Sequence, residues 1–425
     1  MRKLPLCALA VIMFVACGKD DFGLNSQPEP QNPYAITPEE AVQMLQSVIG
    51  GETTRSISVS DIQTLNKSAF VPSTRSGADE EAIYIVDIEG KGSAIMSADK
   101  RMEPIYAILD DTKISAEQLV GVTTRSATED ESNPEDYILV LLNSAIQRDI
   151  EEAEQRGLEM PLIPRDKVWQ VKTNLYVREP MLNTEWHQDD PYNKLYDYKP
   201  NSQFRYPAGC APIALAQIFY YNRFPSSING ETFDWDLIAR HEVGNINIPT
   251  IADNEVAKLV YQIKVGTGSY YRVRTDANGQ PKYETATDMP NVQVFMRFNG
   301  YSDATLADYS LEDVIDMVYY KQLPVLVSGI DSNTGAGHAW VIDGCNIYKL
   351  DNWVRHYTDS LIYNEYIEST IYCNLVHCNF GWGRSSEPNE NWIGYYTSAI
   401  FNPIIDSIRY NYSSNLQMVT YSLNN

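Results

Sequence analysis

Cys210 stands where a thiol can act as a nucleophile. Gly209 precedes it, and Pro212 falls in the first turn of an apolar run that ends at Asn222. Proline is tolerated in the first turn of a helix, so the pattern predicts a helix that opens at this cysteine. The positive end of a helix dipole lowers the pKa of a thiol and favours the nucleophilic thiolate. Taken alone, Cys210 is better interpreted as a buried structural cysteine, because such cysteines are common near helix starts.

Two later segments offer partners for that thiol. Gly337 and His338 follow a Gly-rich turn and open an apolar strand, which places an imidazole at a sheet edge beside a cleft. Asn379 ends another apolar strand, and Phe380 and Trp382 follow it. The asparagine could hold the imidazole tautomer, and the aromatic rings could exclude water. The simpler interpretations are a strand-end histidine bound to backbone and an asparagine that satisfies a local turn.

The order and spacing of these residues favour acyl-transfer chemistry. His338 comes 128 residues after Cys210, and Asn379 comes 169 residues after it. Papain-type enzymes carry Cys, His and Asn in this order, with the last two ~130–150 residues downstream of the cysteine. The first gap is just short of that range and the second exceeds it. An imidazole beside the thiol is the arrangement that generates a thiolate nucleophile.

Together, these motifs resemble those of the streptopain family of papain-like cysteine peptidases. The resemblance rests on Trp186 to Asn193, Gly209 to Gln217, His338 to Gly344 and Asn379 to Gly383. It implies Cys210 as nucleophile, His338 as base, Gln188 as oxyanion-hole donor and Asn379 as a further catalytic group. Phe380, Trp382 and Gly337 would form an aromatic wall or contact substrate. The implied fold is α+β, with a helical half packed on a twisted antiparallel sheet, and the implied partner is a protein or peptide substrate. The mechanism needs no metal or organic cofactor.

Two departures from the family pattern keep other functions open. Phe380 replaces the first tryptophan of the family's Asn-Trp-Gly-Trp-Gly segment, and residues 265–289 lack its Asp-Tyr-Gly run. Residues 351–368 look like an inserted hairpin of unknown use. One alternative is a non-catalytic surface protein that keeps the fold in order to bind protein or glycan. The other is a different thiol acyl-transfer enzyme, such as a cell-wall amidase or a transglutaminase.

The first residues predict an exported lipoprotein. Residues 1–16 combine a basic start with an apolar run too short to span a bilayer, which is typical of a signal peptide. The run ends before Cys17 in a way that resembles a bacterial lipobox, so we expect Cys17 to carry lipid and residues 17–33 to form a tether. The predicted location is the cell envelope, as an outer-membrane lipoprotein that is surface exposed or released. The alternative is an ordinary secretory peptide with an incidental cysteine.

Residues 34–160 resemble the family's inhibitory propeptide, residues 161–176 contain a Pro-marked linker or activation region, and residues 177–425 form the peptidase domain. In the propeptide, Thr37-Pro38-Glu39-Glu40 predicts a capped helix start, and two apolar runs at residues 82–89 and 93–97 predict a hairpin. Three Thr-Arg-Ser sites, at Arg55, Arg75 and Arg125, lie in polar stretches. They are either ordinary solvated arginines or points where an activating Arg-specific protease trims the zymogen.

Charge and cysteine content limit the remaining choices. The net charge of −23 excludes a nucleic-acid protein, because phosphate binding needs clustered Lys and Arg. Four cysteines remain beyond Cys7 and Cys17, namely Cys210, Cys345, Cys373 and Cys378. Two disulfides are the simplest prediction for an exported chain, whereas a functional Cys210 leaves an odd number and hence at least one buried thiol. Metal binding is not indicated, since no Cys-x-x-Cys pair occurs.

Overall fold

The structure is a computed structural model, and it describes residues 32–49, 57–71, 80–121, 134–157, 166–241, 250–275, 281–330, 337–358, 362–383, 392–400 and 414–423. The chain divides into residues 1–32 and a second unit, Pro33–Asn425, and the fold below is that of the second unit. The predicted signal peptide, Cys17, Arg55, Arg75 and Arg125 lie outside the described residues. Among the described helices, none is long and apolar enough to cross a membrane.

The first part of the second unit is a sheet with helices on both faces. Its elements are α1 (Pro38–Ile49), β1 (Val59–Asn66), η1 (Lys67–Ala69), β2 (Glu81–Ile88), β3 (Ser93–Ser97), β4 (Ile105–Leu109), α2 (Ala116–Gly121) and α3 (Pro134–Gly157). The predicted capping box is present, because the Thr37 and Glu40 side chains each bind the other's backbone N–H. Tyr84 and Val86 pack with α1, while Ile83 and Ile85 pack with α3, so the strand alternation of β2 buries both of its faces. The predicted hairpin of β2 and β3 is confirmed.

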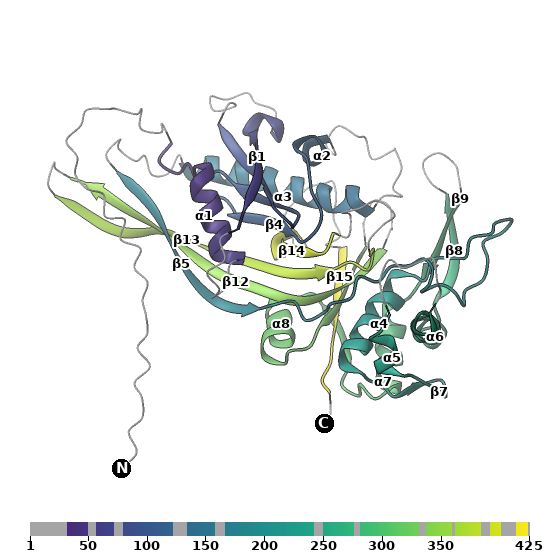
Figure 1. The fold of residues 1–425 in the computed structure, drawn as a ribbon. Helices are drawn as coiled ribbons and strands as arrows, with labels where there is room; N and C mark the ends of the chain where they lie inside the picture. The colour runs from purple at the N-terminus through teal and green to yellow at the C-terminus, as the bar shows by residue number, and fades with distance from the viewer. Residues whose placement is uncertain are drawn as a thin grey trace, which may run out of the picture. The chain divides into compact units, whose positions relative to one another are not determined.

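The part of the second unit that follows is the peptidase-like part, and the middle of the chain forms its helical half. It contains α4 (Cys210–Asn222), α5 (Trp235–Ile238), α6 (Ile251–Gly266) and α7 (Met289–Phe298), with two small hairpins, β6 (Ser227–Ile228) with β7 (Glu231–Thr232) and β8 (Tyr270–Thr275) with β9 (Pro281–Ala286). Figure 1 shows these helices gathered at one end of the sheet. Nearly every side chain of α4 is buried, which explains its uniformly apolar sequence.

The last part supplies the large sheet on which these helices pack. Its elements are β10 (Thr305–Asp308), α8 (Leu311–Ile315), the π-helical turn η2 (Asp316–Tyr320), β11 (Val325–Ile330), β12 (Gly337–Tyr357), β13 (Tyr363–Asn379), β14 (Gly394–Thr397), η3 (Ser398–Ile400) and β15 (Ser414–Thr420). The strands run in the order β1-β2-β3-β4-β14-β13-β12-β11-β15-β10, and β5 (Lys167–Arg178) also pairs with β12. The helical half therefore packs on an antiparallel sheet, as predicted.

Two strand pairings were not predicted from the sequence. The predicted propeptide, 34–160, shares one sheet with the rest of the second unit in the described chain, because its strand β4 pairs with β14. The predicted linker, 161–176, is a strand from Lys167 onward, since β5 pairs along Cys345–Arg355 of β12. Prolines precede this segment, and its pairing partner lies about 175 residues away in sequence, so local composition suggested a linker.

Candidate active site

A glycine turn with a positive φ presents Cys210 at the first position of α4. Gly209 has a φ of +91°, which L side chains rarely adopt. A Cβ at Gly209 would also lie 2.9 Å from the backbone oxygen of Thr285 in β9. Only glycine therefore fits between the β8–β9 hairpin and the start of α4. The predicted helix and the position of the cysteine are confirmed.

Cys210 lies beside the strand that carries His338. Helix α4 packs on β12, and a backbone hydrogen bond links the Cys210 thiol with Ala339, the residue after His338. Burial raises the pKa of the Cys210 thiol, and hydrogen bonds from the backbone of Ala339 and Ala211 offset only part of that effect. In the full chain the resting group is therefore the thiol.

A main-chain oxygen orients the imidazole of His338. Its Nε2 lies 2.9 Å from the carbonyl oxygen of Phe380. A carbonyl can only accept, so Nε2 carries the proton and Nδ1 keeps the lone pair that a general base needs. Burial lowers the pKa of His338 to about 4, although the Phe380 carbonyl opposes that shift. The described full chain therefore holds a neutral thiol and a neutral imidazole.

Aromatic rings cover His338, as the sequence predicted. The ring of Trp382 lies 4.9 Å from the imidazole, centroid to centroid, and that of Phe380 lies 6.1 Å away. Trp340 stacks at 6.2 Å from the same imidazole. Phe380 thus fills the place of the family's tryptophan as an apolar screen, and its side chain is not the group that orients His338. Gly337 is exposed at the start of β12 and makes only ordinary van der Waals contacts.

Asn379 does not bind His338 in this structure. Its Nδ2 donates to the Thr184 backbone oxygen at 2.7 Å, and its Oδ1 accepts from the Gly381 N–H at 3.1 Å. Gln217 of α4 approaches the same Oδ1 at 3.5 Å. The Asn379 side chain thus ties the end of β13 to α4 and to the segment before Gln188, and it closes the turn that holds the Phe380 carbonyl. These contacts support a positioning role for Asn379, and its catalytic role stays a prediction.

Gln188 is held close to the nucleophile by its backbone. The Ala208 N–H donates to the Gln188 carbonyl at 2.7 Å, and Ala208 precedes Cys210 by two residues. The Trp382 turn closes on the same segment, since a Cβ at Gly383 would lie 2.8 Å from the Glu185 backbone oxygen. The Gln188 side chain is half-buried. These contacts bring together the segments that carry the predicted nucleophile, base and oxyanion donor.

Sequence reasoning missed a buried ionic cluster two residues before Asn379. The Nδ1 of His377 lies 2.6 Å from Asp343 of β12, and its Nε2 lies 3.2 Å from Asp110, just after β4. Burial alone would lower the pKa of His377, but the two carboxylates outweigh it and raise that pKa to about 9. The cluster therefore joins the two parts of the chain through a charged histidine. The sequence shows that these residues are present, but it does not show that they pair, because they lie in segments far apart in the chain.

The four described cysteines are free thiols. Cys345, Cys373 and Cys378 are buried in the two apolar cores, where they pack as small hydrophobic side chains. The alternative of two disulfides is therefore not realised. Among the described residues, no group of three His, Cys, Asp or Glu side chains could hold a metal ion.

Comparisons with known proteins found one family model and solved structures that are similar to this chain. Residues 186–388 match the family model described as the Peptidase C10 family. A solved structure of a cysteine-to-alanine mutant fragment of prointerpain A from Prevotella intermedia matches with a TM-score of 0.50 and 18% sequence identity, over 86% of this chain and 100% of that one. Active interpain A cysteine protease from the same organism gives a TM-score of 0.40 and 23% identity, over 57% of this chain and 95% of that one. No curated protein matches the chain.

The family match covers residues 186–388, and the solved-structure match shows the fold. The segment that matches the Peptidase C10 family model, residues 186–388, includes Gln188, Cys210, His338 and Asn379. The fold of the second unit is the α+β fold of prointerpain A, which joins a propeptide to a papain-like domain. The predicted fold class is confirmed.

Proposed function

We propose that this chain is the zymogen of an exported, lipid-anchored cysteine endopeptidase in which Cys210 and His338 carry the reaction. The observation that carries the proposal is the contact of the Cys210 thiol with Ala339, next to an imidazole whose Nε2 is bound to a carbonyl oxygen. That arrangement leaves Nδ1 of His338 as the base. The residue roles are inferred from this geometry and from the motif positions.

The reaction follows from the groups present. Nδ1 of His338 takes the thiol proton, and the Cys210 thiolate attacks the peptide carbonyl carbon. The Cys210 backbone N–H and the Gln188 amide stabilise the resulting oxyanion, a contribution of about 3 kcal/mol per donor. The imidazolium then gives its proton to the departing amine, which leaves an acyl-enzyme. Water, deprotonated by the same imidazole, hydrolyses the thioester and restores the thiol.

The propeptide-like part, residues 34–160, is the inhibitor in this proposal. Its strand β4 extends the sheet of the peptidase domain, and Asp110 reaches the buried His377. Cleavage before Lys167, in the first residues of the predicted activation region 161–176, would separate it from β5 and from residues 177–425. An activating protease that cuts at Arg55, Arg75 or Arg125 would trim it further.

The lipid anchor and the location remain part of the same proposal. The support is the sequence alone, namely the apolar run that ends at Cys17 and the polar residues 17–33 after it. The protein would then reside in the cell envelope as an outer-membrane lipoprotein. Detergent phase partition of the wild type and Cys17→Ala tests this point, since only the wild type should enter the detergent phase.

Hydrolysis of an internally quenched peptide library tests the catalytic proposal. After limited trypsin treatment, we expect turnover from the wild type, and at least a 1,000-fold loss in Cys210→Ala and His338→Ala. Cys345→Ala, which also lacks a thiol, is the matched control and should stay active. Equal turnover in Cys210→Ala and the wild type would contradict the proposal, as would cross-linking of amines without hydrolysis.

A further inference from the structure

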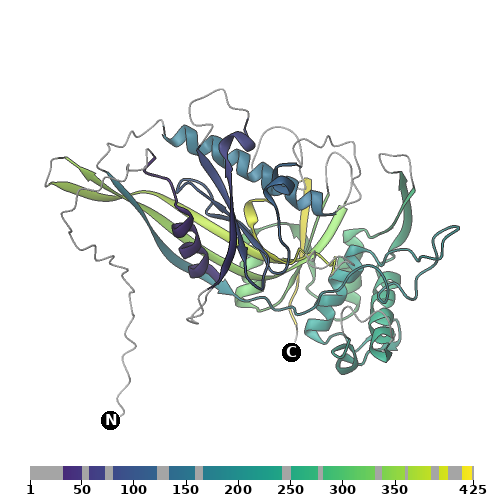
Figure 2. The same cartoon turned by 45° about the horizontal axis from the view of Figure 1, so that its top comes forward.

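Strands β5, β12 and β13 continue well beyond the active site as a three-stranded extension. We call it the arm, and it comprises residues 167–178, 345–357 and 363–375. Figures 1 and 2 show it reaching away from the helical half, with α1 lying along it. At ~3.3 Å per residue, Asn346 lies roughly 25 Å along β12 from His338. The arm includes the predicted inserted hairpin, residues 351–368, and it takes no part in the catalytic geometry described above.

The arm shares an apolar core with the propeptide-like part. Tyr348, Leu350, Cys373 and Leu375 of the arm are buried in one cluster with residues of α1 and β2–β4. The opposing side chains of that cluster include Ala41, Leu45, Val48, Tyr84, Met96 and Ile105. The contact therefore resembles a stable interface, with a dry apolar centre.

Two arm side chains bind the end of α1. The Lys172 ammonium donates to the Ser47 carbonyl at 2.8 Å, and Asn346 Nδ2 donates to the Val48 carbonyl at 3.1 Å. Carbonyls in the last turn of a helix have no partner within the helix, and they carry the negative end of its dipole. The arm therefore satisfies groups that α1 cannot satisfy by itself.

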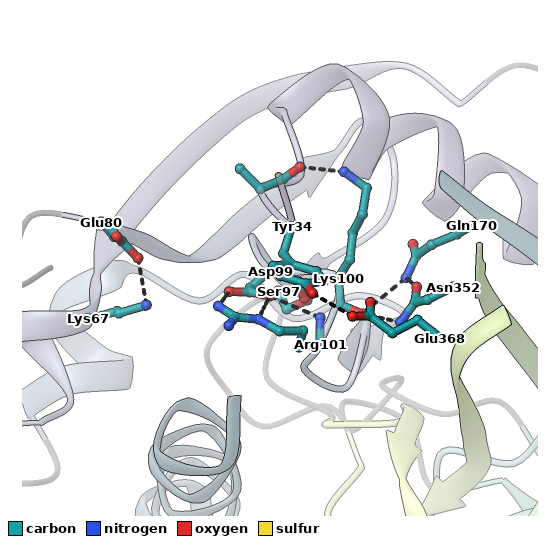
Figure 3. Close-up of polar contacts among 11 residues, drawn as sticks. Tyr34, Lys67, Glu80, Ser97, Asp99, Lys100, Arg101, Gln170, Asn352 and Glu368 are labelled. Atoms are coloured by element: carbon teal, nitrogen blue, oxygen red, sulfur yellow. Dashed lines mark hydrogen bonds and ion pairs between the residues drawn. The ribbon is translucent and has the colours of Figure 1, made fainter. Parts of the chain in front are cut away.

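A second polar contact lies at the corner formed by Tyr34 and the Asp99–Arg101 segment (Figure 3). The buried Asn352 donates to the Lys100 carbonyl at 3.0 Å, and its own Oδ1 accepts from Gln170. The Tyr34 hydroxyl donates to Glu368 of β13 at 2.8 Å. Arg101 lies over the Tyr34 ring at 4.5 Å, and Asp99 holds its guanidinium. The arm thus binds one main-chain group and one side chain of this corner.

We propose that the arm is a docking platform that retains the propeptide after the connection between Gly157 and Lys167 is cut. The inference rests on the proposed zymogen function and names the surface that controls it. Because the contacts of the platform do not involve the connecting residues, one cut does not free the peptidase domain, and further cuts within residues 34–157 are needed to release it. The occupant of the platform is the chain's own propeptide.

The test uses the chain from residue 18 onward with Cys210→Ala, so that self-cleavage cannot interfere. Residues 158–165 are replaced by the recognition sequence of a site-specific protease, and the chain is cut at that single point. We expect the two fragments to co-elute in gel filtration at about 1 µM and to keep their native mass as a complex. Separate elution of two folded fragments would overturn the proposal.

Variants identify the arm as the cause of retention. Asn346→Leu removes the donor to the Val48 carbonyl, and Asn352→Leu leaves the Lys100 carbonyl only the longer 3.4 Å bond from Gln170. Asn346→Leu should therefore weaken fragment affinity about tenfold or more, and Asn352→Leu should weaken it several-fold. Tyr34→Phe removes only one hydroxyl and should weaken it a few-fold, which keeps the test valid if a buried variant misfolds. Glu365→Gln is the control, because Glu365 is exposed on the same arm and pairs with Arg355.

Unchanged affinity in all three arm-contact variants would overturn the proposal. Retention is measured without catalysis, so an inactive wild type would contradict the proposed function and leave the arm's role intact. Conversely, an active enzyme whose fragments separate at once would support the proposed function and contradict the arm's role in retention.

Discussion

His338 donates from Nε2 to the carbonyl oxygen of Phe380 at 2.9 Å, and this bond fixes which nitrogen can act as a base. The acceptor is a main-chain atom, so the identity of the side chain at position 380 does not decide the tautomer. The departure from the family's tryptophan at this position therefore does not remove the orienting contact. Phe380 contributes by packing, since it stacks on Trp382 at 4.8 Å and contacts Tyr396 edge-on.

Phe380→Ala should lower stability and activity together. The side chain is almost fully buried, and large-to-small changes of this kind cost about 3–5 kcal/mol of unfolding free energy. Thermal unfolding and peptide hydrolysis measure the two effects. Phe380→Trp keeps the carbonyl and an aromatic ring, so it should retain more activity than Phe380→Ala. An alanine variant that is stable and fully active would contradict the packing role.

Asn379→Ala should reduce kcat about tenfold or more with a smaller change in KM, because the turn that holds the Phe380 carbonyl loses its support. The pH profile of kcat should shift as well, since the orientation of His338 affects its titration. Asn374→Ala changes the same residue type on β13 outside the turn and serves as the control. If Asn379→Ala had normal kinetics and a normal pH profile, its assigned role would be wrong.

The neutral state of the catalytic pair predicts slow thiol alkylation in the uncut chain. Burial raises the pKa of Cys210 and lowers that of His338 to about 4, so neither group is charged near pH 7. The rate of Cys210 alkylation should therefore rise only as the pH passes the ordinary thiol range. Cys210→Ala gives the background from other cysteines. A rate plateau between about pH 5 and 8 would instead reveal a preformed ion pair, contrary to this expectation.

Because of His377, we expect alkaline pH to lower the unfolding free energy of the uncut chain. Its pKa is raised to about 9, so the stabilisation that its charge provides is complete below about pH 6.5 and is lost as the pH rises through about 9. The full shift corresponds to roughly 3 kcal/mol, shared between Asp343 and Asp110. Between pH 6.5 and 9.5, the unfolding free energy of the wild type should fall more than that of Asp110→Asn.

Asp61→Asn is the control for that measurement, since Asp61 is exposed on β1. It should show the same pH dependence as the wild type. If Asp110→Asn also matched the wild type, the charged contact between Asp110 and His377 would contribute nothing.

Local sequence signals predicted the elements that carry the chemistry. The apolar helix at Cys210, the strand at His338 and the capping box at Thr37 all follow from short-range patterns. The acceptor for His338 could not be predicted, because a backbone oxygen has no sequence signature, and the nearby Asn379 was the natural candidate. The pairing of β5 with β12 was missed for a different reason, since strand pairing between distant segments is decided by tertiary packing.

Labelling by a thiol-directed epoxide probe tests the central claim most directly. The chain from residue 18 onward would be compared with Cys210→Ala, with and without trace trypsin, and mass spectrometry would locate both the cuts and the label. The account predicts labelling at Cys210 alone, and only after the propeptide has been cut into fragments and released. Release of the propeptide without any labelling of Cys210 would contradict it, because the site would then not assemble as a peptidase.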